Sequence, residues 1–223
     1  MSKIKAVIFD LDGTLINSVY DLADAVNYAL GKHSYPLRKT EEFYYFVGDG
    51  ALKMIERALP KEIASTQLAL KLREDFIEYY KDHSRDKTVL YDGIRQTLDD
   101  LKSMGIKLAV VTNKPDSQTQ IIINHFLKDY FAQVHGNTDN IKTKPDPELT
   151  LSVMSKMNVK PDECIFIGDS GVDMQTGINS GALPVGVLWG FRTKEELEEN
   201  GAKYIISKPD ELLKIIGDIN ERN

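Results

Sequence analysis

The sequence is poor in the features that mark exported, membrane-bound or disulfide-stabilised proteins. Its 223 residues include one cysteine, Cys164, so no internal disulfide can form, and the apolar run around it predicts a small core residue. No apolar run approaches the roughly 20 residues that span a bilayer, and Lys3, Lys5 and Asp10 precede any possible signal-peptide core. We therefore expect a cytoplasmic protein with no membrane partner.

The chain also lacks blocks of one charge sign. Its formal net charge of -6 comes from 28 basic and 34 acidic residues that are interleaved along the sequence. This pattern argues against a nucleic-acid partner, although a local basic pocket for a phosphate remains compatible with it. With 42% hydrophobic residues, the chain can fold as one large domain, or as one domain that carries a smaller one.

The most informative stretch that is present runs from Ala6 to Leu15. Its apolar, β-branched and aromatic first half predicts a strand buried on both faces of a parallel sheet, and it ends in Asp10, Asp12, Gly13 and Thr14. Asp and Gly are common turn formers, so these residues could simply end the strand. Alternatively, the two carboxylates hold a cation and attack a substrate at the carboxyl end of the strand.

Residues 16–86 read as helical throughout, with no convincing strand. Helix and strand patterns then alternate to the end of the chain, which predicts an α/β fold: a Rossmann-like doubly wound parallel sheet with helices on both faces. We expect a catalytic core of residues 1–15 and 87–223 and a small inserted helical cap domain of residues 16–86. The strands expected after the insertion cover 106–111, 131–135, 164–168, 184–188 and 203–206, and the helices 94–105, 116–127, 148–157, 172–179 and 209–219.

Three of the expected strands end in reactive residue types. The first ends at Asp10 and Asp12, the second at Thr112, and a later one at Asp169, with Asp173 one helical turn beyond. The carboxyl ends of parallel strands face one crevice, where carboxylates this close together repel one another unless a cation lies between them. An all-oxygen ligand set favours Mg²⁺ over zinc or copper.

Four motifs in this order resemble the haloacid dehalogenase-like superfamily of aspartyl-phosphate phosphotransferases, over the whole chain. They are Asp10-Leu11-Asp12-Gly13-Thr14, then Thr112-Asn113, then Lys144-Pro145, then Gly168-Asp169-Ser170 followed by Asp173. Weaker cues are similar to the phosphoglycolate phosphatase group. They include Val47-Gly48-Asp49-Gly50-Ala51, Val111-Thr112-Asn113-Lys114-Pro115, Lys144-Pro145-Asp146-Pro147 and Trp189-Gly190.

The resemblance implies a role for each motif residue in phosphoryl transfer. Asp10 would be the nucleophile and a metal ligand, and Asp12 would carry protons while its backbone carbonyl binds the metal. Thr112 and the amide of Asn113 would bind the phosphoryl oxygens. Lys144, directly before its proline, would supply positive charge there, although Lys142 competes for that role.

The metal would be Mg²⁺, with Asp169 as a further ligand and Asp173 binding it directly or through water. Ser170 could instead be only a helix N-cap. Gly48, Asp49 and Gly50 form either a loop that closes over the substrate or a simple connection between helices. We expect Tyr44, Tyr45, Tyr79 and Tyr80 to be packing residues of the cap. The four histidines, His33, His83, His125 and His135, lie outside the motifs and are expected not to be catalytic.

The function implied is a Mg²⁺-dependent phosphatase that hydrolyses a small phosphorylated metabolite, with 2-phosphoglycolate as the best single substrate. A sugar phosphomutase or a pyrophosphatase would use the same chemistry. A dehalogenase is disfavoured because that reaction needs neither Asp12 nor Asp169, and a phosphate-binding protein without turnover is the non-enzyme alternative. The sequence leaves open whether the protein is a monomer or a homodimer.

Overall fold

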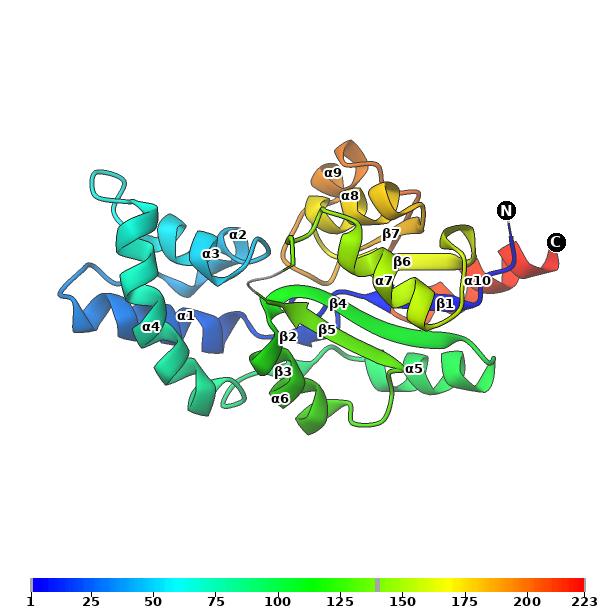
Figure 1. The fold of residues 1–223 in the computed structure, drawn as a ribbon, viewed down its shortest axis with the longest axis horizontal. Helices are drawn as coiled ribbons and strands as arrows, with labels where there is room; N and C mark the ends of the chain where they lie inside the picture. The colour runs from blue at the N-terminus through cyan, green and yellow to red at the C-terminus, as the bar shows by residue number, and fades with distance from the viewer. Residues whose placement is uncertain (1, 139–140, 223) are drawn as a thin grey trace.

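The computed structural model describes residues 2–138 and 141–222, so the first and last residues of the expected core lie outside the described part. It shows a six-stranded sheet with helices on both faces, and a group of four helices beside one end of that sheet (Figure 1). Among the described residues, no helix is both long enough and apolar enough to cross a membrane.

The sheet confirms the predicted fold class. β1 (Ala6–Phe9) lies in its centre, all neighbouring strands are parallel, and the order is β5-β4-β1-β6-β7-β8. The strands other than β1 are β4 (Lys107–Pro115), β5 (Gln133–Asn137), β6 (Cys164–Gly168), β7 (Leu183–Val187) and β8 (Tyr204–Ile206). β4 continues four residues past its predicted end at Val111, because it bends rather than stops there.

Alternate residues of β1 enter two different hydrophobic clusters, as the period of two in a strand requires. Val7 and Phe9 pack with α5 (Ile94–Ser103), α6 (Asp116–Phe126) and α10 (Glu211–Glu221). Ala6 and Ile8 face the other side, where the core contains α7 (Glu148–Lys156) and the buried Cys164.

α8 (Gly171–Ser180) packs on β6 and β7, and the short α9 (Lys194–Glu199), which the sequence pattern did not predict, contacts α8. A 3-10 turn, Pro161–Glu163, leads into β6.

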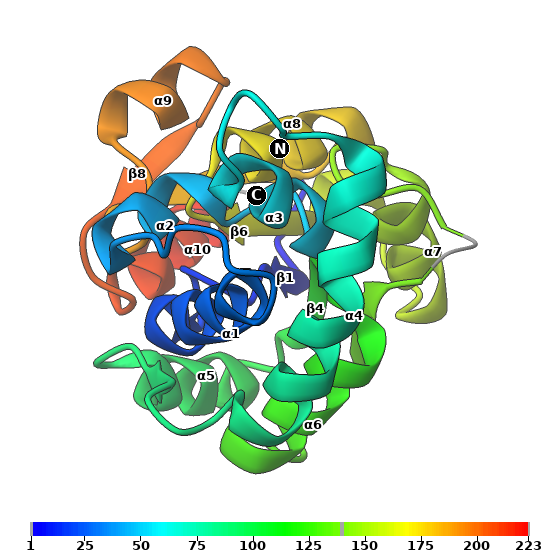
Figure 2. The ribbon, with the colours of Figure 1, turned by 90° about the vertical axis from the view of Figure 1, so that its left-hand side faces the viewer.

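The four helices beside the sheet have a hydrophobic core of their own. They are α1 (Val19–Lys32), α2 (Thr40–Phe46), α3 (Ala51–Ala58) and α4 (Thr66–His83), and Figure 2 looks onto them from their end of the molecule. Of the buried described residues in this core, only Phe191 comes from beyond α4. Phe191 follows β7 and so joins this helical core to the sheet.

The prediction that residues 16–86 contain no strand was wrong at their first two positions. β2 (Ile16–Asn17) pairs antiparallel with β3 (Val89–Leu90), so the connections that leave and re-enter the sheet part run side by side. A pair of two-residue strands is too short to produce a detectable sequence pattern. The buried Asp21 carboxylate strengthens this junction, because it accepts hydrogen bonds from the backbone N–H groups of Lys87 and Thr88 and from the Thr88 hydroxyl.

Candidate active site

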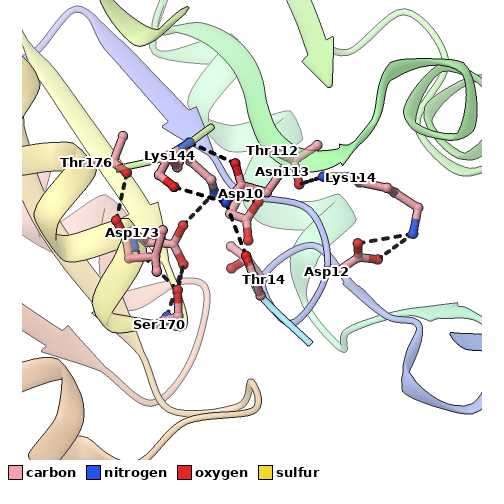
Figure 3. A network of polar contacts seen from close by, with 12 residues as sticks. Asp10, Asp12, Thr14, Thr112, Asn113, Lys114, Lys144, Ser170, Asp173 and Thr176 are labelled. Carbon is pink, nitrogen blue, oxygen red and sulfur yellow. Dashed lines mark hydrogen bonds and ion pairs between the residues drawn. The ribbon is translucent and has the colours of Figure 1, made fainter. Parts of the chain in front are cut away.

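The predicted site residues meet where the carboxyl ends of β1, β4 and β6 come together (Figure 3). Asp10 directly follows β1, and Asp169 directly follows β6. Thr112 and Asn113 lie in the last part of β4. The parallel register therefore brings together residues that are more than a hundred positions apart in the sequence.

The end of β4 is irregular. Its pairing with β5 is regular as far as Val111, opposite His135, and is next found at Pro115, opposite Asn137. Residues 112–114 thus leave the regular hydrogen-bond ladder, and such a bulge changes the direction in which the side chains of these residues point. Gly136 of β5 allows this close approach, since a Cβ atom there would lie 2.6 Å from the carbonyl oxygen of Lys114.

Three buried carboxylates, Asp10, Asp169 and Asp173, form the centre of the site. Each offers an oxygen, and these oxygens lie within 4.8 Å of one another. Burial, with the nearby charges of Asp173 and Asp10, raises the pKa of Asp169 to about 8. Burial also raises the pKa of Asp10 to about 6, although the Lys144 charge opposes this change. A compact, all-oxygen set of carboxylates that resist ionisation together fits a hard divalent cation.

Glycines make this close packing possible. A Cβ atom on Gly168 would lie 2.2 Å from Cγ of Asp173, and one on Gly190 would lie 2.2 Å from Cβ of Asp169. Gly13 has a φ of +86°, and a Cβ there would lie 2.4 Å from a carboxylate oxygen of Asp169. Any side chain at these three positions would displace one of the two carboxylates.

Lys144 lies against two of the three carboxylates. Its Nζ is 2.8 Å from Oδ1 of Asp10 and 2.6 Å from Oδ1 of Asp173, and its side chain is 2% exposed. Burial by itself would lower the pKa of Lys144, but the two carboxylates outweigh it and raise that pKa. The competing Lys142 has a side chain that is 75% exposed and pairs with Asp146 instead.

Asn113 uses its side chain to hold the Lys144 backbone. Its Oδ1 accepts a hydrogen bond from the Lys144 N–H at 2.8 Å, and its Nδ2 donates to the Lys144 carbonyl at 3.3 Å. The same Nδ2 donates to the carbonyl of Gly48, in the loop between α2 and α3. Asn113 therefore connects the Lys144 loop with the helical part.

Ser170 caps α8, as the N-cap alternative predicted. Its hydroxyl accepts from the Asp173 N–H at 3.4 Å and donates to Oδ2 of Asp173 at 2.6 Å. The capping contacts also hold the Asp173 carboxylate in place, because its other oxygen faces Lys144. Asp173 is thus both a partner of the N-cap residue Ser170 and a member of the carboxylate cluster.

Asp12 forms a second charged group, separate from the three carboxylates. Its side chain is turned toward Lys114, whose Nζ lies 3.0 and 3.1 Å from the two carboxylate oxygens (Figure 3). Ser18 donates a hydrogen bond to Oδ1 of Asp12 at 2.5 Å. Lys114 also donates to the hydroxyl of Tyr80 at 2.8 Å, so the packing residue Tyr80 has a polar contact as well.

Sequence reasoning did not single out Lys114 as a site residue. Burial by itself would lower its pKa, but Asp12 and Tyr80 outweigh burial and raise it. The available signal was a lysine directly after Thr112-Asn113, at the carboxyl end of a strand. Lysines are usually solvated, so its burial needed the tertiary structure to become visible.

A cavity lies between these residues and the helical part, with about 460 Å³ of empty space including its open mouth. Gly48 and Gly50 line it, whereas the Asp49 side chain pairs with Arg57 of α3. Arg192, after β7, donates to the backbone carbonyls of Tyr44, Tyr45 and Val47. The preceding N–H, that of Phe191, donates to Asp169, so one short segment contacts both the carboxylate cluster and the loop above it.

Comparison with known proteins gives consistent matches along the chain. Residues 7–187 match the family model of haloacid dehalogenase-like hydrolases. A phosphoglycolate phosphatase of Vibrio parahaemolyticus is 33% identical over 219 residues, which covers 96% of each chain. One of Mannheimia succiniciproducens is 33% identical over 223 residues, covering 96% of this chain and 99% of that protein.

Solved structures have the same fold. The crystal structure of a predicted phosphoglycolate phosphatase from Haemophilus somnus has a TM-score of 0.87 at 30% identity, covering 96% of this chain and 99% of that one. A predicted phosphatase from Clostridium acetobutylicum has a TM-score of 0.88 at 30% identity, covering 97% of this chain and 100% of that one. On these matches, the chain belongs to the haloacid dehalogenase-like hydrolase family, and to the phosphoglycolate phosphatase-like group within it.

Proposed function

We propose that this chain hydrolyses a small phosphomonoester with the help of Mg²⁺, and that 2-phosphoglycolate is the best candidate substrate. The observation that supports this most strongly is the meeting of Asp10, Lys144, Asp169 and Asp173 at one end of the sheet, with Lys144 in contact with two of the carboxylates. The names of the curated relatives motivate the choice of substrate.

The first step is attack by a carboxylate oxygen of Asp10 on the phosphorus of the substrate. The ester P–O bond breaks, an aspartyl phosphate forms, and Asp12 donates a proton to the departing oxygen. In the second step, Asp12 takes a proton from a water molecule, whose oxygen attacks the phosphorus. The P–O bond to Asp10 breaks, and inorganic phosphate leaves with Asp10 restored.

The neighbouring residues stabilise charge rather than move protons. Thr112 and the backbone amide of Asn113 bind the phosphoryl oxygens, and the Lys144 ammonium balances the negative charge on these oxygens and on Asp10. Asp10, Asp169 and Asp173, with the backbone carbonyl of Asp12, hold the cation. When bound, Mg²⁺ supplies positive charge that offsets the negative charge of the transferring phosphoryl group.

The helical part has the place of a cap. Residues 16–86 form this cap over a core of residues 1–15 and 87–223, and the loop at Gly48, Asp49 and Gly50 closes the substrate in. Gly48 and Gly50 already line the cavity, and the Asp49–Arg57 pair holds the loop shape. The protein acts in the cytoplasm on a small phosphorylated metabolite.

The test is a turnover screen on a panel of small phosphomonoesters, sugar phosphates and pyrophosphate, with Mg²⁺ and with EDTA. Inorganic phosphate should appear from 2-phosphoglycolate only with Mg²⁺, and Asp10→Asn should lower kcat by about 10⁴-fold or more. Lys144→Met should lower kcat by about 100-fold or more, whereas Lys142→Met, at the exposed lysine, should leave it unchanged. Undiminished turnover by Asp10→Asn would refute the mechanism, and an isomerised sugar phosphate in place of inorganic phosphate would identify a phosphomutase.

A further inference from the structure

The described residues that line the cavity include only one cation, Lys114. The other charged lining residues are Asp10 and Asp12. The wall contributed by the helical part consists of Leu22, Val47, Ala51, Met54, Phe76 and Tyr80 with the two loop glycines, so that the Tyr80 hydroxyl is the polar side-chain group among these residues. Lys144 is not part of this lining, since it lies behind Asp10, against Asp173.

Lys114 lies on the far side of Asp12 from the carboxylate cluster. Figure 3 shows Asp10 and Lys144 together on one side, and Asp12 turned away from them toward the Lys114 ammonium. In the proposed function Asp12 faces the ester oxygen that departs. The part of the substrate that departs with this oxygen therefore lies near Lys114, and the phosphoryl group lies near Lys144.

We propose that Lys114 is a specificity-determining residue that binds an anionic group on the departing part of the substrate. This inference rests on the proposed function and narrows its substrate class to phosphate esters of short hydroxy acids. An anion in a mostly apolar cavity needs a charged partner, and the lining offers one ammonium, which the anion would share with Asp12 and Tyr80. A sugar phosphate fits the cavity less well, because the mostly apolar wall offers few hydrogen-bond partners for its several hydroxyl groups.

The structure holds Lys114 rigidly in this place. Its side chain is 3% exposed, the Tyr80 hydroxyl accepts a hydrogen bond from Nζ at 2.8 Å, and Nζ lies 4.7 Å from the centre of the Tyr80 ring. Its backbone N–H donates to the Thr112 hydroxyl at 3.3 Å, and its carbonyl accepts from the Thr119 hydroxyl at 3.4 Å. A charge placed in advance loses less entropy when it binds a ligand, which suits it to discrimination between small substrates.

The test compares two substrates that differ in the anionic group. 2-Phosphoglycolate and ethyl phosphate share a phosphate and a two-carbon chain, but only the former has a carboxylate. Lys114→Met should lower the ratio of their kcat/KM values by about 10- to 100-fold, as expected for the loss of a charge-assisted hydrogen bond. Lys114→Arg should keep much of the ratio because it keeps the charge.

Ser18→Ala is the matched control, because the Ser18 side chain also donates to Asp12 but has no charge. It should lower kcat/KM for both substrates by a similar factor and leave the ratio unchanged. An equal effect of Lys114→Met on both substrates would overturn the proposal, since the lysine would then act only through Asp12. If Lys114→Met does not fold, the ratio of the two kcat/KM values of the wild type decides. A wild type with equal kcat/KM for both esters would also overturn the proposal. A wild type that hydrolyses neither ester, nor any other of the panel, refutes the proposed function itself.

Discussion

When divalent cations have been removed, the free energy of unfolding of this protein should fall as pH rises from about 5 to about 8.5. Asp10 and Asp169 have folded-state pKa values of about 6 and about 8, above their usual value of 3.8. Between these values the folded state binds protons that the unfolded state has released. The stabilisation by these protons is therefore complete below about pH 3.8 and is lost as pH rises through about 6 and then about 8.

The size of this effect follows from the two pKa shifts, since one pKa unit corresponds to about 1.4 kcal/mol. The rise from 3.8 to about 6 at Asp10 corresponds to about 3 kcal/mol, and the rise to about 8 at Asp169 to about 6 kcal/mol. The two contributions are not independent, because Asp173 raises both pKa values and Asp10 also raises that of Asp169. We expect a total loss on the order of 5 kcal/mol.

Urea unfolding at about pH 5, 6.5 and 8.5 measures this loss, once with EDTA and once with millimolar Mg²⁺. Mg²⁺ should restore most of the stability at the highest pH and little at the lowest, because the cation competes with protons for the same oxygens. In Asp169→Asn the side chain cannot ionise, so the EDTA profile should be flatter than that of the wild type. A metal-free wild type that is equally stable at all three pH values, or more stable at the highest, would refute this reasoning.

Two further substitutions test the packing around the site. Gly168→Ala should lower the free energy of unfolding by about 1–3 kcal/mol and also reduce turnover, because the new Cβ would lie 2.2 Å from Cγ of Asp173. The control is Gly217→Ala in α10, which should not destabilise the fold because a Cβ there meets nothing within 4 Å. Equal urea midpoints for the two variants would contradict the argument. Arg192→Gln should raise KM by about tenfold with a smaller change in kcat, because the backbone carbonyls at the end of α2 lose their charged donor and the cavity wall loosens. An unchanged KM in steady-state assays would show that the Arg192 contacts do not support the cavity.

Several features of the fold were predictable because they depend on local patterns. The apolar runs before Asp10 and Asp169 were long enough to predict strands, and their polar ends then had to meet at one edge of a parallel sheet. β2 and β3 were not predictable, because two residues show no period. α9 was not predicted either; it is six residues long and only Leu197 in it is buried, so it has little apolar pattern.

The sequence alone determined the fold class and the candidate residues Asp10, Asp12, Thr112, Lys144, Asp169 and Asp173, because their order along the chain and the ends of apolar strands are properties of the sequence. Only the tertiary structure decided which charges are partners. It brings Lys144 to Asp10 and Asp173, leaves Lys142 in solvent, and pairs Asp12 with Lys114 across 102 positions. Such pairings depend on strand order and on the bulged end of β4, and these arise from packing between distant segments that no local pattern records.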